Sequence, residues 1–144
     1  MNVRRSSGPR RVRELMSTRV VSTTPRNTLT AVARQMRDER VGATALIEDG
    51  RMVGIITERD LMRAIADGHD PRTARAGDHM TPTPMTVKPD DTASDAAALM
   101  IVIHSRHLPV VQDDVPVGFL SARDLLELSR RTPAGLDRVA FEVW

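Results

Sequence analysis

Two short segments of the chain place a hydroxyl, an arginine and an aspartate at the same spacing. They are Thr57-Glu58-Arg59-Asp60 and Ser121-Ala122-Arg123-Asp124. At the start of a helix, a hydroxyl and the first free N–H groups can face an anion such as a phosphate. The aspartate one turn on can accept hydrogen bonds from two vicinal ribose hydroxyls, and the arginine adds positive charge near a phosphate. The chemistry of both segments is therefore that of a candidate nucleotide site.

The same residues also have an interpretation that needs no ligand. Thr57 and Ser121 are ordinary helix N-caps, and Asp60 and Asp124 are first-turn acids that complement a helix dipole. The glycine that precedes each segment, Gly54 or Gly118, permits the close approach of a ligand or of a neighbouring strand. The residues alone leave these alternatives open.

The two segments lie in a repeat whose copies are 64 residues apart. Residues 54–61 match residues 118–125, and the same offset aligns identical residues without gaps from Met16/Met80 to Val53/Val117. A repeat unit of this length indicates two copies of one small folding module. We expect a basic, flexible tail at 1–11, a first copy at 12–70, a linker at 71–75, a second copy at 76–130 and a C-terminal tail at 131–144.

Each copy predicts the order helix, strand, helix, strand, strand, helix. The lead-in helices are expected at 12–16 and 75–80, and the first strands at 20–24 and 85–88. Helices with apolar stripes follow Thr28 and Thr92, and hairpins are expected at 43–56 and 108–120. The closing helices begin after Thr57 and Ser121. Such a copy has a three-stranded sheet with one face well covered, so the two copies must pack together to bury the other apolar faces.

The copies differ at two places. Asp49-Gly50 is a strong hairpin signal, whereas Asp114 replaces the glycine in the second copy and predicts a looser turn. Residues 99–103 are apolar nearly all round, so we expect the helix that contains them to be the more buried one, or to lie at an interface.

The repeated pattern of glycine, two apolar residues, Thr or Ser, two variable residues and Asp resembles the cystathionine-β-synthase (CBS) domain. Two such domains in tandem form a CBS pair, or Bateman module. The resemblance covers residues 12–128, and it includes residues 106–111 and the proline before each stripe-bearing helix. It implies an α/β fold in which two modules, each a small three-stranded sheet with flanking helices, pack with pseudo-two-fold symmetry.

The resemblance also implies functional roles. Thr57 and Ser121 would bind phosphate, Asp60 and Asp124 would bind ribose, and Arg59 and Arg123 lie beside the phosphate. The adenine would lie against Val21, Thr23 and Ala45 in the first copy and against Met85, Val87 and Pro109 in the second. The implied ligand is AMP, ADP, ATP or S-adenosylmethionine, bound by a homodimeric regulatory protein that signals to an unknown protein partner.

Catalytic and metal chemistry are not predicted. His104 and His107 are three residues apart, but the chain has no cysteine and no carboxylate at ligand spacing to complete a zinc site. These histidines are expected to line a helix end or a phosphate. We find no nucleophile–base pair and no glycine-rich phosphate loop of the Walker or Rossmann kind. The sequence therefore predicts no enzyme, no metal and no cofactor.

The net charge of +2 hides a basic N-terminus. Residues 1–13 carry five arginines and no acid, so the remainder sums to −3 (16 basic and 19 acidic residues). Such a segment is typical of a disordered leader, with nucleic-acid binding as the alternative. Aromatic residues make up only 2% of the chain, which disfavours a stacking platform for single strands.

The remaining expectations concern location and the C-terminus. The chain has no apolar run long enough to span a membrane and no apolar core of a signal peptide. Zero cysteines fits a cytoplasmic protein. Apolar residues alternate over 136–144, so this stretch is expected to add an edge strand, to clasp a partner subunit or to remain loosely attached. A purely structural dimer with empty clefts and an enzyme with an unfamiliar site remain alternatives.

Overall fold

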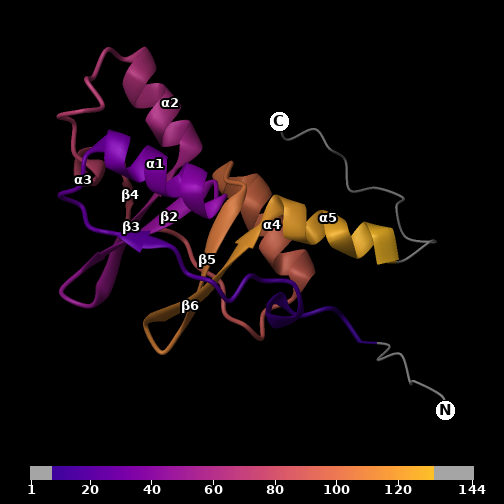
Figure 1. Cartoon of the computed structure of the whole chain (residues 1–144). Coiled ribbons are helices and arrows are strands. Elements are labelled where there is room, and N and C mark those ends of the chain that lie inside the picture. The colour runs from indigo at the N-terminus through magenta and orange to yellow at the C-terminus, as the bar shows by residue number, and fades with distance from the viewer. Residues whose placement is uncertain (1–7, 132–144) are drawn as a thin grey trace.

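The computed structural model describes residues 8–131, and it forms two related modules (Figure 1). The first copy contains η1 (Val12–Glu14), β1 (Ser22–Thr23), α1 (Leu29–Glu39), β2 (Ala43–Glu48), β3 (Arg51–Thr57) and α2 (Glu58–Ala66). The second contains α3 (Ala76–His79), β4 (Thr81–Pro82), α4 (Ala93–Ile103), β5 (His107–Gln112), β6 (Val115–Ser121) and α5 (Ala122–Arg131). The predicted α/β fold of two related modules is confirmed. The tail segments 1–7 and 132–144 lie outside the described residues.

The two stripe-bearing helices begin and end in the same way. The Thr28 hydroxyl accepts from the Ala31 N–H at 3.2 Å, and the Thr92 hydroxyl accepts from the Asp95 N–H at 3.1 Å. Both helices end at a residue in the left-handed conformation, Arg40 in α1 and His104 in α4.

Within the described residues, no helix is long and apolar enough to cross a bilayer.

Each sheet has one strand or bridge more than the three strands predicted for a copy. The sheet built on the first hairpin has the order β1-β2-β3-β4, in which β4 comes from the second copy; β1 and β2 are parallel and the other pairs antiparallel. In the second module, β5 and β6 form the antiparallel hairpin. Single bridges continue this hairpin on both sides, parallel at Val87–Val110 and antiparallel at Ser17–Phe119. The strand predicted at 85–88 is therefore one bridge long.

The two hairpin turns have the same conformation, so the expectation of a looser second turn is wrong. Asp49 and Gly50 both have positive φ (50° and 75°), and Asp113 and Asp114 do as well (51° and 62°). Aspartate enters the left-handed region more readily than most residues because its short side chain can hydrogen-bond locally. Asp114 thus forms the turn that Gly50 forms in the first copy.

Each lead-in packs on the opposite copy. Val12, with Leu15 and Met16 beside it, contacts the core of β5, β6 and α4, and Val12 is fully buried there. Ala76 and Met80 contact the core of α1, β2 and β3 instead. The lead-ins are therefore exchanged between the copies, and neither core is complete without a segment from the other. The boundaries proposed from the repeat describe sequence copies and remain a prediction.

Gly54 and Gly118 lie where the exchanged segments cross the hairpins. A Cβ on Gly118 would lie far inside van der Waals contact with the Ser17 carbonyl oxygen, and one on Gly54 would lie 2.9 Å from the Thr81 carbonyl oxygen. The repeated glycine is thus explained by the close approach of a neighbouring strand, one of the two alternatives that the sequence left open.

Thr44 is a buried polar residue at the position where the second copy has the core residue Leu108. Its side chain is fully buried, and its hydroxyl has no hydrogen-bond partner. Since an unpaired buried hydroxyl is costly, Thr44→Val should stabilise the protein by about 1 kcal/mol. Thermal unfolding measures this, with Thr23→Val as the control that loses the 2.6 Å bond from Asn27 and should not gain. A Thr44→Val protein that melts below the wild type would contradict the interpretation.

Candidate ligand-binding cleft

Both helix-start segments form reciprocal caps. The Thr57 N–H donates to Asp60 Oδ2 at 2.8 Å, and the Asp60 N–H donates to the Thr57 hydroxyl at 3.4 Å. In the second copy the corresponding distances for Ser121 and Asp124 are 2.8 and 3.2 Å. The structural interpretation is therefore realised in both copies. These bonds use only one oxygen of each carboxylate, so the other remains for a ligand hydroxyl.

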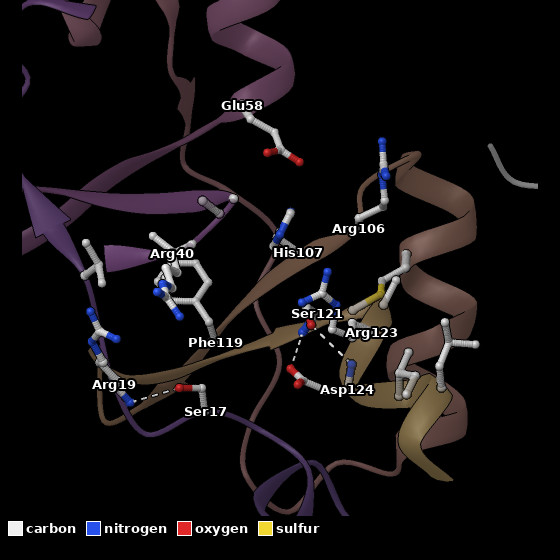
Figure 2. A pocket seen from close by; sticks show the side chains of 18 of the residues that line it. Ser17, Arg19, Arg40, Glu58, Arg106, His107, Phe119, Ser121, Arg123 and Asp124 are labelled. Carbon is white, nitrogen blue, oxygen red and sulfur yellow. Dashed lines mark hydrogen bonds between the residues drawn. The ribbon is translucent and has the colours of Figure 1, made fainter. Parts of the chain in front are cut away.

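A cleft of about 1500 Å³ opens beside the second of these caps (Figure 2). The second copy contributes the cap itself, Ser121 and Asp124, together with His107. The first copy contributes Arg40 from the end of α1 and Glu58 from the start of α2. A ligand in this cleft would therefore contact both copies at once.

The predicted site residues divide between the cleft and its surroundings. Those that line the cleft are Val21, Ser121, Arg123 and Asp124. Those that lie elsewhere are Thr57, Arg59, Asp60, Thr23, Ala45, Met85, Val87 and Pro109. Among the latter, Ala45, Val87 and Pro109 are buried in the sheets, whereas Met85 is 55% exposed. The cleft thus brings together the predicted polar residues of the second segment but not Thr57, Arg59 and Asp60 of the first.

The two repeated arginines differ in their surroundings. Arg59 donates from Nη1 to the His104 carbonyl oxygen at 3.2 Å, so it links the start of α2 to the end of α4. Arg123 points into the cleft beside Ser121 and Asp124 (Figure 2). The first arginine is therefore engaged between the copies, while the second is available to a ligand.

Arg40 and Glu58 are cleft residues that the sequence did not indicate. Arg40 has no counterpart in the nucleotide pattern, and Glu58 is one of its variable positions. Both enter the cleft only because the two copies pack against each other. No local signal could have identified them, since their proximity to Ser121 depends on the packing of α1 and α2 against the second copy.

His107 lines the cleft between the two copies (Figure 2). Its ring lies against Gly42, at 3.1 Å from the position of a Cβ on that glycine, and Glu58 borders the same glycine. Burial lowers the pKa of His107 below its ordinary value. Glu58 and Asp124 oppose this shift, while Arg106 and Arg59 add to it. The imidazole is therefore held in its neutral form more strongly than in the unfolded chain.

We expect this histidine to make the fold sensitive to acid. Because its folded pKa is depressed, the unfolded chain takes up a proton first as the pH falls below about 6.5, and stability decreases there. His107→Gln should reduce the loss of melting temperature between pH 7.5 and 5.5, because glutamine does not titrate. Thermal unfolding at both pH values measures this, with the exposed His69→Gln as control. An unchanged pH dependence in His107→Gln would contradict the assignment.

Within residues 8–131, no three His, Cys, Asp or Glu side chains come together as metal ligands. His69 and His79 form an edge-to-face pair with ring centroids 4.7 Å apart. His104 ends α4, and His107 lines the cleft.

Comparison with known proteins agrees with this architecture. The model of the CBS domain family matches residues 12–67 and 76–131. The CBS domain-containing protein YhcV of Bacillus subtilis is 31% identical over 115 residues, which cover 79% of this chain and 81% of the relative. Hypoxic response protein 1 of Mycobacterium tuberculosis is 30% identical over 115 residues, covering 78% of this chain and 80% of the relative.

Solved structures show the same fold. A crystal structure described as the CBS domain NE2398 has a TM-score of 0.81 and 28% identity, covering 85% of this chain and 99% of that chain. The CBS domain pair of MJ0100, in complex with 5′-methylthioadenosine and S-adenosyl-L-methionine, has a TM-score of 0.78 and 21% identity, covering 84% and 96%. CBS pairs are regulatory, non-catalytic modules. With two matched copies in one repeat, the chain belongs to the CBS domain family as a tandem pair.

Proposed function

We propose that the protein is a regulatory sensor that binds an adenine nucleotide or S-adenosylmethionine in the cleft and passes a conformational signal to a protein partner. The observation that carries this proposal is the composition of the cleft, which combines Ser121 and Asp124 of one copy with Arg40 of the other. A ligand that contacts both copies binds best at one relative position of the copies, so binding shifts their arrangement.

Several features support an adenosine ligand. Asp124 keeps one carboxylate oxygen outside its cap for a ribose hydroxyl, and Arg123 provides a guanidinium for a phosphate. The apolar side chain of Val21 lines the same cleft. The volume of about 1500 Å³ leaves room for such a ligand, since small-molecule sites typically measure about 300–1000 Å³. The ligands of the MJ0100 pair contain an adenosine group as well.

Thermal-shift and calorimetric titration with AMP, ADP, ATP and S-adenosylmethionine tests the proposal. At least one of these ligands should raise the melting temperature, because it binds only the folded protein. Asp124→Asn should weaken binding about tenfold, since it removes a charged acceptor but keeps an oxygen for the cap. Asp60→Asn is the matched control and should bind as the wild type does. No stabilisation by any ligand would contradict the proposed function.

Nucleic-acid binding through the N-terminal arginines is less well supported. Arg10 pairs with Glu14, and Arg13 pairs with Asp90. Arg11 donates to the Asp90 carbonyl oxygen at 3.0 Å. Because Arg10 has a partner in the lead-in turn and Arg11 and Arg13 have one at Asp90, less of their charge is available to a phosphate backbone. Retention of a DNA or RNA probe that weakens with salt would favour this alternative.

We further propose that the sensor is a cytoplasmic homodimer. Apolar side chains remain exposed on the outer faces of α2 and α4: Met62, Ile65, Ile101 and Val102, from 47% to 73% exposed. The expectation that α4 is the more buried helix is thus wrong for the single chain, and its alternative of an interface stays a prediction. A second copy would cover these faces. Sedimentation equilibrium giving only the monomer mass at micromolar concentration would contradict the homodimer.

A further inference from the structure

The described residues that line the cleft carry more positive than negative charge. They include six arginines, one histidine and three carboxylates. Three of the arginines have an acidic partner: Arg10 pairs with Glu14, Arg19 with Glu39 and Arg37 with Asp38. Arg40 and Arg123 form no ion pair within residues 8–131. Among the cleft arginines, we therefore take Arg40 and Arg123 as the side chains whose positive charge a ligand would meet.

Arg40 is held at the edge of the cleft by an unusual backbone conformation. It ends α1 with φ 57°, and its N–H bonds to the Arg37 and Met36 carbonyls, so the backbone rather than the side chain completes the helix end. A left-handed non-glycine residue costs about 1 kcal/mol or more. The side chain lies on one side of His107, and Arg123 lies on the other (Figure 2).

The other copy does not reproduce this pair. The residue equivalent to Arg40 is His104, and the residue equivalent to Arg123 is Arg59, which is engaged with the His104 carbonyl oxygen at 3.2 Å. A pair of arginines with no acidic partner in the described part of the chain is therefore specific to this cleft and is not repeated in the other copy. Its chemistry is suited to an anion, because guanidinium groups bind phosphate oxygens in a bidentate manner.

We propose that the cleft selects a nucleoside di- or triphosphate over S-adenosylmethionine, and that Arg40 and Arg123 hold the phosphates. This inference rests on the proposed function and names the ligand class for the same site. The added phosphates carry negative charge toward the two guanidinium groups. The sulfonium of S-adenosylmethionine brings a positive charge to the same place, where like charges repel.

Isothermal titration calorimetry with ATP, AMP and S-adenosylmethionine tests this inference on the full chain. ATP should bind at least tenfold more tightly than S-adenosylmethionine. Arg40→Asn should weaken ATP binding about tenfold, weaken AMP binding less, and leave S-adenosylmethionine unchanged or tighter. Asparagine suits this test because it tolerates the left-handed conformation. Arg34→Gln, which removes the same charge from an exposed position of α1 outside the cleft, is the matched control and should bind ATP normally.

The outcomes separate this inference from the proposed function. S-adenosylmethionine binding as tightly as ATP would overturn the inference while leaving an adenosine sensor in place. Equal weakening of all three ligands by Arg40→Asn, or equal weakening of ATP by Arg34→Gln, would overturn the phosphate role of Arg40. Absence of binding by every ligand would overturn both proposals.

Discussion

Gly118→Ala should destabilise the protein by about 3 kcal/mol or more, which corresponds to a fall in melting temperature of about 10 °C. The added methyl group would be driven into the Ser17 carbonyl oxygen. This oxygen accepts from the Phe119 N–H at 3.0 Å, and the Ser17 N–H donates to the Phe119 carbonyl at 2.9 Å. Neither the new Cβ at residue 118 nor the Ser17 carbonyl oxygen can move without its backbone. The two segments can therefore separate only if this pair of hydrogen bonds breaks. Thermal and urea unfolding measure the effect.

Two other glycines provide matched controls. Gly8→Ala places its methyl group in open space and should leave stability unchanged. Gly54→Ala should reduce stability by an amount between those of the other two substitutions. The closest neighbour of the added methyl group is the flexible Met80 side chain, and the Thr81 carbonyl oxygen is 2.9 Å away. A Gly118→Ala protein as stable as Gly8→Ala would show that the crossing segments do not pack as closely as described.

Removal of residues 1–17 should unfold the second module. Val12 is fully buried in its core, and burial of such a side chain contributes about 1.5–3 kcal/mol. The deletion also removes backbone bonds to Asp91, Pro89, Ala93 and Phe119. The combined loss is about 5 kcal/mol, comparable with the whole stability of a small domain.

Amide hydrogen exchange distinguishes the modules in this experiment. Protection should be lost in β5 and β6 but largely retained in β2 and β3, whose core receives Ala76 and Met80 instead. A chain that begins at Gly8 is the matched control, because it keeps Val12 and its hydrogen bonds. Retained protection of β5 and β6 after removal of residues 1–17 would contradict the exchanged packing.

The elements themselves were predictable because their signals are local. The apolar stripe and the capping hydroxyl of Thr28 predict α1, and the structure confirms both. The same holds for Thr92 and α4. The turn at Asp113-Asp114 could not be predicted in the same way, because the surrounding hairpin decides whether aspartate enters the left-handed region there.

The exchange of the lead-ins could not be predicted from the repeat. An alignment of the two copies shows that Val12 corresponds to Ala76. This alignment would be identical whether each segment packed on its own copy or on the other copy. The residues that line the cleft could be predicted only in part, for the same reason. Ser121 and Asp124 were identifiable from spacing, whereas Arg40 enters only through the packing of the copies.

The exchanged lead-ins also bear on how such a chain arose by duplication. If a protein with one copy kept the packing seen here, its lead-in would lack a hairpin to pack on and its glycine would lack the strand that crosses it. Two such chains could satisfy each other by trading these segments, as in a domain-swapped dimer. Fusion of two genes would then convert this exchange of segments between two chains into an exchange within one chain. The smallest unit that recombination can move intact is accordingly the pair.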